Sequence, residues 1–356
     1  MLNIKKYLFA VLLMVVSSAS MAAASQSKNE SSEVDVKEIV LGHMSDAYEW
    51  HITTWNGVHV SIPLPVILYS EHSGWHIFLS SVFHHALNGE YEGFYIDNAT
   101  GKIYEHVPGV AEGEKPWDFS ITKDVVQIWF VVFIMLGIFI SSARWYKKHK
   151  SFDESPKGLV GLVEMFVMMV NDDIIKACIG AKHYKPYAPF LLTVFFFIFL
   201  TNLMGLIPTF PGGANVTGHI VVTFFLALCT FLLVNLFGNK EYWKEIFWPD
   251  VPTWLKVPVP LMPVIEFFGI LTKPFALMVR LFANMMGGHA IILASACVIF
   301  ITCQVGMAIG VPMTAFSFIL MVFMNCLELL VAFIQAYVFT MLSSIFIGLA
   351  HPEHHK

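Results

Sequence analysis

The chain has 356 residues, of which 56% are hydrophobic and only 13% are charged, about half the usual globular share. This composition excludes a disordered chain, a disulfide-rich scaffold and a basic nucleic-acid-binding protein, and it favours a membrane protein. The net charge of −5 is unevenly distributed, because residues 25–124 hold 15 acidic and 5 basic side chains. We therefore expect an acidic, water-facing segment followed by a hydrophobic one.

The first 24 residues are typical of a secretory signal sequence. Lys5 and Lys6 precede the apolar stretch Tyr7–Val16, which is short for a membrane span, and small residues follow it. An uncleaved membrane anchor is the alternative interpretation. In both cases residues 25–124 are predicted to be exported.

Residues 25–124 predict a small β-rich domain, because short β-branched and aromatic runs alternate with turn residues. Asp97–Gly101 has the composition of a hairpin turn. Eight of the 15 histidines lie in this segment, which admits a metal site, but scattered solvent-facing histidine is the favoured interpretation. The predicted strands are His51–Trp55, Val58–Ser61, Val66–Tyr69, Trp75–Leu79, Gly93–Ile96 and Lys102–Tyr104.

Val125–Ala143 contains 19 residues without a charge, which is enough for one helical membrane crossing. Arg144 and three lysines follow it, and the positive-inside rule places that end in the cytoplasm. Pro156–Lys185 is amphipathic, so it is predicted to lie as a helix on the inner membrane surface.

Pro186–Asn239 has no Asp, Glu, Lys or Arg, and Pro208–Gly213 interrupts it, which indicates a helical hairpin. Two further helices, Leu261–Gln304 and Pro312–Leu349, follow on either side of a predicted turn. Each is longer than the ~30 Å bilayer core and is therefore expected to tilt. The predicted fold is an all-α polytopic membrane protein with five crossings, one surface helix and a small β-rich exported segment.

The predicted organisation has four parts. These are a signal peptide (1–24), an exported acidic segment (25–124), a membrane domain (125–350) and a cytoplasmic tail (351–356). The N-terminal segment would be periplasmic.

Arg280 is the first candidate functional residue, because an ionisable side chain at membrane depth is costly and arginine keeps its proton there. It is followed by 47 residues without Asp, Glu, Lys or Arg. A face of small residues around a fixed cation suits close approach by another helix. A snorkelling arginine is the alternative interpretation. The residues predicted to share its face are Ala276, Ala283, Asn284 and Gly287.

The last helix carries Asn325, Glu328 and Gln335 on one side. In an antiparallel hairpin that turns near residue 308, His289 lies level with Glu328, and Arg280 lies level with Gln335. A fixed cation plus a separate imidazole–carboxylate pair suits proton movement, because histidine titrates near neutral pH. A structural hydrogen-bonded cluster at Glu328 is the alternative.

Three stretches resemble subunit a of F-type ATP synthases. Lys273–His289 is similar to that family's arginine helix, Leu327–Phe339 to its last helix and Thr201–Pro208 to an earlier hairpin. The resemblance covers about residues 125–350 and leaves out the acidic segment. Many bacterial members have the acid on the first helix and the histidine on the last, whereas here the two are exchanged, as in the mitochondrial arrangement.

The resemblance implies a stator in the bacterial inner membrane beside a ring of c subunits, with peripheral-stalk b subunits and other ATP synthase subunits as partners. Arg280 would hold each ring carboxylate ionised, with Asn284 and Gln335 beside it. His289 and Glu328 would line the half-channel that admits protons from outside.

No cofactor or metal is implied for this chain. It contains no GxxxxGK[ST] loop, so nucleotide chemistry would belong to partner subunits. A secondary ion transporter, with repeated broken helices in two halves, is the alternative function, and a purely structural membrane anchor is a third.

Overall fold

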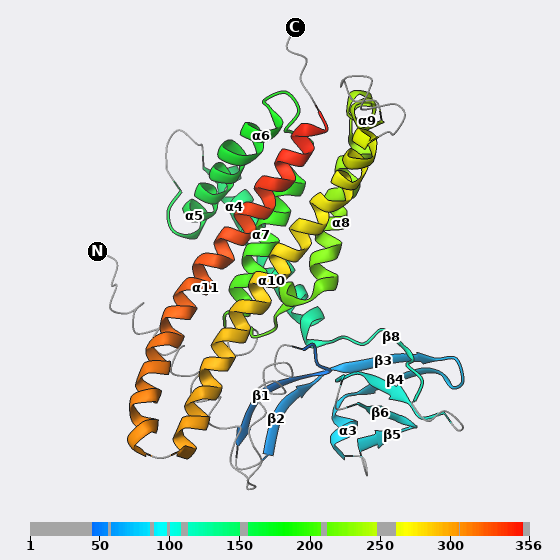
Figure 1. Ribbon diagram of the computed structural model, residues 1–356, viewed down its shortest axis with the longest axis vertical. Helices are drawn as coiled ribbons and strands as arrows, with labels where there is room; N and C mark the ends of the chain where they lie inside the picture. Colours follow the sequence, from blue (N-terminus) through cyan, green and yellow to red (C-terminus); the bar gives the residue numbers. More distant parts are fainter. Residues whose placement is uncertain are drawn as a thin grey trace. The chain divides into compact units, whose positions relative to one another are not determined.

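The computed structural model (Figure 1) describes residues 45–55, 58–85, 89–97, 100–107, 113–149, 156–207, 212–247, 261–305 and 307–351. The predicted signal peptide and residues 352–356 lie outside the described residues. The chain forms two compact units, and each is described by itself. Unit 1 comprises Met1–Phe130, Leu203–Val216 and Gly287–Glu328, and unit 2 comprises Val131–Asn202, Thr217–Met286 and Leu329–Lys356.

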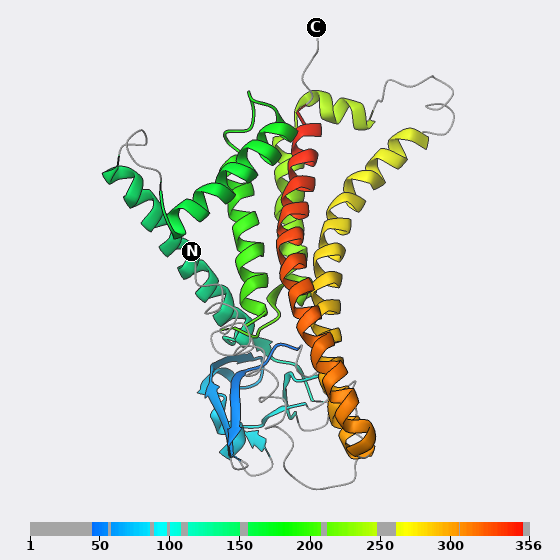
Figure 2. The same ribbon diagram turned by 90° about the vertical axis from the view of Figure 1, so that its left-hand side faces the viewer.

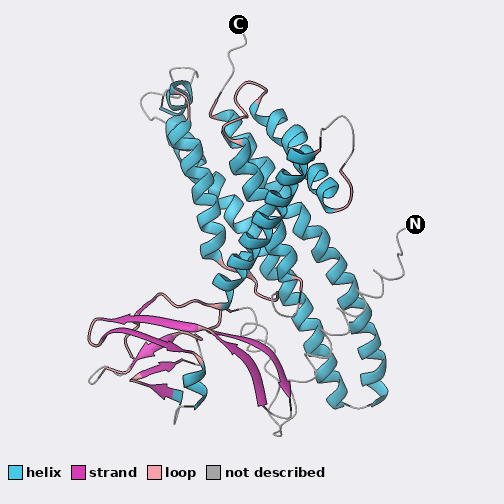
Figure 3. Cartoon of the chain, turned by 180° about the vertical axis from the view of Figure 1, so that it is seen from behind, coloured by secondary structure: helices cyan, strands magenta, loops and turns pink. Residues whose placement is uncertain are grey.

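The described strands all fall between residues 49 and 118, as the colouring by secondary structure shows (Figure 3). The strands pair antiparallel in three small sheets, ordered β1-β2, β4-β3-β8 and β5-β6-β7. The elements are β1 (Glu49–Trp55), β2 (Val58–Pro63), β3 (Pro65–Ser70), β4 (Gly74–Leu79), α3 (Ser81–His85), β5 (Glu90–Tyr91), β6 (Phe94–Ile96), β7 (Ile103–Glu105) and β8 (Trp117–Asp118).

The prediction of a β-rich region is confirmed, because all six predicted runs overlap observed strands. The predicted hairpin also forms, since β6 pairs antiparallel with β7 around Asp97–Gly101. The two-residue strands β5 and β8 and the short helix α3 were not expected. Their few residues carry no periodic signal, and tertiary pairing decides their conformation.

Five described helices are long and apolar enough to cross a membrane, which confirms the predicted number. Figures 1 and 2 show the last two as consecutive antiparallel helices of a hairpin. At ~1.5 Å per residue both exceed the ~30 Å bilayer core. The five are α4 (Lys123–Lys148), α7 (Ala188–Gly205), α8 (Ile220–Phe237), α10 (Leu261–Val305) and α11 (Met307–Leu349).

The turn between α10 and α11 is shorter than the sequence suggested. The last helix was predicted to begin at Pro312, but α11 begins at Met307, so Gly310 and Pro312 both lie within its first turns. Proline has a helical φ and is tolerated best near a helix start, so Pro312 does not end the helix here.

The predicted surface helix is divided. It consists of α5 (Leu159–Met168), a π-helical segment η2 (Met169–Lys176) and α6 (Ala177–Ile179). The wider π turn buries Ile174 and Ile175 while Asp173 stays exposed. A further short helix, α9 (Lys240–Phe247), follows α8.

Gly348 in α11 leaves no room for a side chain, because a Cβ there would lie 2.2 Å from the carbonyl oxygen of Cys178. We expect Gly348→Ala to lower the free energy of unfolding by about 1–3 kcal/mol, since the backbone must move. Thermal unfolding in detergent measures this loss. Gly137→Ala in α4 is the matched control, because a Cβ there meets no atom within 4 Å and alanine favours helix. Equal stability of the two variants would contradict the prediction.

Candidate functional site

An imidazole–carboxylate pair joins the two long helices inside unit 1. His289 Nδ1 on α10 contacts Glu328 Oε1 on α11. Glu328 is only 4% exposed and the His289 side chain only 15%. The register predicted for the hairpin therefore brings these two residues together. The second carboxylate oxygen, Oε2, is buried and makes no hydrogen bond within the described residues, so it is open to a proton.

Two glycines make the space in which this pair lies. A Cβ at Gly288 would lie 3.1 Å from Glu328 Oε1. A Cβ at Gly205, the last residue of α7, would lie 3.5 Å from His289 Nε2 and 3.3 Å from the carbonyl oxygen of Ala214. The end of α7 therefore lies beside the imidazole, and a side chain at Gly288 would fit only if the Glu328 carboxylate shifted slightly.

Polar groups from α4 and from the α7–α8 connection belong to the same unit. Gln127 is fully buried, and its Oε1 accepts a hydrogen bond of 2.8 Å from the backbone N–H of Ala214. Its Nε2 is buried without a hydrogen-bond partner within the described residues. Asn215 is also buried. Sequence reasoning missed these residues, and the available signal was a polar side chain inside an apolar span.

Arg280 lies on an open face of α10 in unit 2. The neighbouring Leu277 and Leu281 are buried, whereas Arg280, Ala283 and Asn284 are exposed. The guanidinium makes no hydrogen bond or ion pair with any described residue. The cation and the small residues beside it are therefore available to another chain.

Gln335, which was predicted to lie level with Arg280, is buried on α11, whereas Arg280 is exposed. No hydrogen bond links these two described side chains. Their proximity therefore stays a prediction, unlike the contact of His289 with Glu328.

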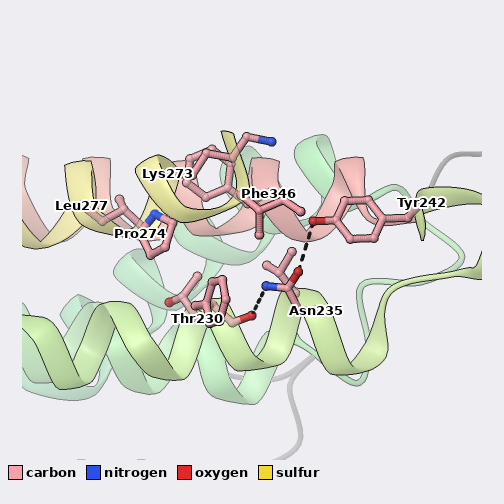
Figure 4. A pocket seen from close by; sticks show the side chains of 10 residues that line it. Thr230, Asn235, Tyr242, Lys273, Pro274, Leu277 and Phe346 are labelled. Carbon is pink, nitrogen blue, oxygen red and sulfur yellow. Dashed lines mark hydrogen bonds between the residues drawn. The ribbon is translucent and has the colours of Figure 1, made fainter. Parts of the chain in front are cut away.

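A small, mostly apolar pocket in unit 2 is lined by Lys273 together with Thr230, Asn235 and Tyr242 (Figure 4). Its space of about 20 Å³ is enough for one water molecule. Lys273 Nζ lies 5.7 Å from the centre of the Phe346 ring. The Tyr242 hydroxyl donates a hydrogen bond of 3.4 Å to Asn235 Oδ1. Burial and the charge of Glu266 raise the pKa of Tyr242, so its hydroxyl stays protonated.

Residues 25–124, called the outer segment after their predicted location, gather no metal-binding cluster of three or more His, Cys, Asp or Glu among the residues that the structure describes. Two of its histidines instead meet glutamates singly. His72 Nε2 lies 3.2 Å from Glu114 Oε2, and His76 Nδ1 lies 2.8 Å from Glu92 Oε2.

Residues 125–348 match the family model described as "ATP synthase A chain", and residues 39–119 match one described as "Domain of unknown function (DUF8433)". The chain is 40% identical over 282 residues to ATP synthase subunit a of Chlorobium phaeobacteroides, with 77% of this chain and 76% of that protein covered. It is 39% identical over 261 residues to ATP synthase subunit a of Myxococcus xanthus, with 70% and 79% covered.

Both alignments cover more of this chain than residues 125–356 alone supply. They therefore include part of the outer segment, which the motifs that resemble subunit a do not cover.

Proposed function

The chain belongs to the ATP synthase A chain family, and we propose that Arg280, His289 and Glu328 are the residues through which it moves protons. As a member of this family it is the proton-translocating stator subunit of an F-type ATP synthase. The observation that carries the residue assignment is one helical hairpin that holds both a buried imidazole–carboxylate pair and an exposed, unpaired arginine. A secondary ion transporter is not favoured, because the relatives are ATP synthase subunits.

Arg280 would work on a carboxylate of the c-subunit ring. A permanent cation at membrane depth needs an anion, and none is within reach in the described chain. The small side chains beside it allow another helix to approach closely. Asn284 shares this exposed face and would hydrogen-bond the same carboxylate. Gln335 would support α11 from its buried position.

His289 and Glu328 would relay protons between the aqueous phase and the ring. The imidazole carries ring nitrogens that can hold or pass on a proton, and Glu328 Oε2 is open to receive it. Gln127 and Asn215 would line the approach, because Gln127 holds Ala214 and Ala214 packs beside Gly205 near the imidazole.

A second half-channel would start at the Lys273 pocket. Lys273 lies seven residues before Arg280 on α10, and His289 lies nine residues after it. The fixed cation therefore stands between the two polar sites along the helix, where it would block a direct proton leak.

We place the chain in the bacterial inner membrane beside the c-ring, with peripheral-stalk b subunits as further partners. The basic residues at the end of α4, which include Lys147 and Lys148, favour a cytoplasmic position for that end. The outer segment would then be periplasmic and the C-terminus cytoplasmic.

The first prediction concerns the cation. Arg280→Ala should abolish proton-driven ATP synthesis in the purified, reconstituted complex, because nothing then holds the ring carboxylate ionised. Arg280→Lys should also fail, since a desolvated lysine can lose its proton. Arg144→Ala is the matched control, because it removes an arginine at the end of α4, and it should leave synthesis near the wild-type rate. Normal synthesis by a fully assembled Arg280→Ala complex would exclude the proposed role.

The second prediction concerns the pair. Glu328→Ala and His289→Ala should each reduce proton flux in vesicles sharply, and the double variant should lose little more, because either deletion already breaks the relay. The exchange of His289→Glu with Glu328→His restores one acid and one imidazole at the same level. It should therefore recover more flux than either single replacement of that exchange. Fully additive losses would mean that the residues act independently.

The third prediction tests orientation. Cysteines introduced at the exposed positions Glu71 and Lys157 should react with a membrane-impermeant reagent from opposite sides of the membrane, because one span, α4, separates them. Glu71→Cys should react from the periplasmic side of intact cells, and Lys157→Cys only in inverted vesicles. The reverse pattern of labelling would show that the chain crosses the membrane in the opposite orientation.

A further inference from the structure

The sheet β4-β3-β8 in the outer segment is apolar on both faces but has a protein core on only one. Val66 and Leu68 of β3 are fully buried in that core, where they pack with Phe94 and Ile103. The alternate residues of the same strands point to the opposite face. This arrangement leaves the second apolar face without a partner among the described residues.

We call this second face the aromatic face. Tyr69 pairs with Trp75 on one side and with Trp117 on the other. The ring centres of Tyr69 and Trp75 are 5.1 Å apart, and those of Trp75 and Phe119 are 5.8 Å apart. The patch is therefore continuous. Its exposed members are Tyr69, Trp75, Ile77, Leu79, Trp117 and Phe119.

The exposure of this face is large for a water-soluble surface. Trp75 is 62% exposed and Ile77 is 73% exposed, and none of the six side chains is charged. Contiguous apolar patches of this kind mark protein or membrane contacts.

The aromatic face is fixed to the start of the membrane helix α4. The connection from β8 to α4 is hydrogen-bonded along its length, from Phe119 N to Ile67 O at 2.9 Å, from Ile121 N to Pro65 O at 3.1 Å and from Lys123 N to Ala47 O at 3.0 Å. It is therefore not a free linker. Three residues lie between Phe119 and Lys123, so Phe119 is within about 14 Å of the first residue of the span.

The face is also turned toward the end of the sheet from which α4 leaves. Figures 1 and 3 show α3, β5 and β6 on the side of this sheet away from the start of α4. These elements carry the core, so the aromatic face lies on the other side. The beginning of α4 adds a further exposed ring, Trp129.

We propose that the aromatic face lies on the surface of the lipid bilayer beside α4, at the level of the headgroups. Trp and Tyr are enriched at this depth, because one part of each ring system is apolar and another is polar. The occupant of the face is then lipid, and the sheet is a monotopic membrane contact added to a spanning helix. This inference needs only that α4 crosses the membrane and does not depend on the proton path.

The test uses the assembled complex in nanodiscs, with the five native cysteines replaced and one environment-sensitive fluorophore attached to an introduced cysteine. Ile77→Cys places the probe on the aromatic face. Glu90→Cys is the matched control, because Glu90 is an exposed residue of β5 on the far side of the core. Leu79→Cys places the probe at a second position on the aromatic face. All three side chains are outside the protein core, so folding should be retained.

We expect the probe at residue 77 to show blue-shifted emission and strong quenching by a nitroxide carried on lipid, with little quenching by iodide in the buffer. The probe at residue 90 should behave in the opposite way. Equal iodide quenching at both positions would show that the face is in water and would overturn the proposal. A probe at residue 77 that neither quencher reaches would also overturn it, because another protein surface would then cover the face.

Discussion

A charge inside a lipid bilayer is stable only when it is paired or neutral, and this constraint decides the arrangement of α10 and α11. Glu328 meets it within the chain through His289. Arg280 does not meet it, because its exposed side chain has no anion among the described residues. One ionisable site in the hairpin is therefore complete and the other is not. In the proposed function, the incomplete site would be completed by a carboxylate of a partner.

Small residues serve the two sites in different ways. Gly288 and Gly205 let backbone approach the pair of His289 and Glu328, so the pair is enclosed by its own chain. The exposed Ala276 and Ala283 beside Arg280 leave the helix surface shallow, which suits contact with a second chain. Small side chains therefore pack a buried site in one unit, and in the other they would leave room for the proposed contact with a second chain.

The sequence predicted the parts of the structure that the bilayer itself dictates. Span lengths follow from membrane thickness, and the contact of His289 with Glu328 agrees with an antiparallel hairpin of the two last helices. The contact of Gln127 with Ala214 could not be predicted, because it depends on how the α7–α8 connection folds against α4. The aromatic face was missed because β3 and β4 are apolar on both faces, so alternation does not reveal which face is the core.

The first residues of α4 tie the outer sheet to the candidate proton path within unit 1. Lys123 is hydrogen-bonded to Ala47 of the outer segment, and Gln127, one helical turn later, holds Ala214. Ala214 in turn lies beside Gly205, where an added Cβ would be 3.5 Å from His289 Nε2. A sheet seated on the lipid surface would therefore hold the start of α4 at a fixed depth. Since Gln127 is part of that helix, the contact of the sheet with lipid would also fix the depth of the backbone around the imidazole.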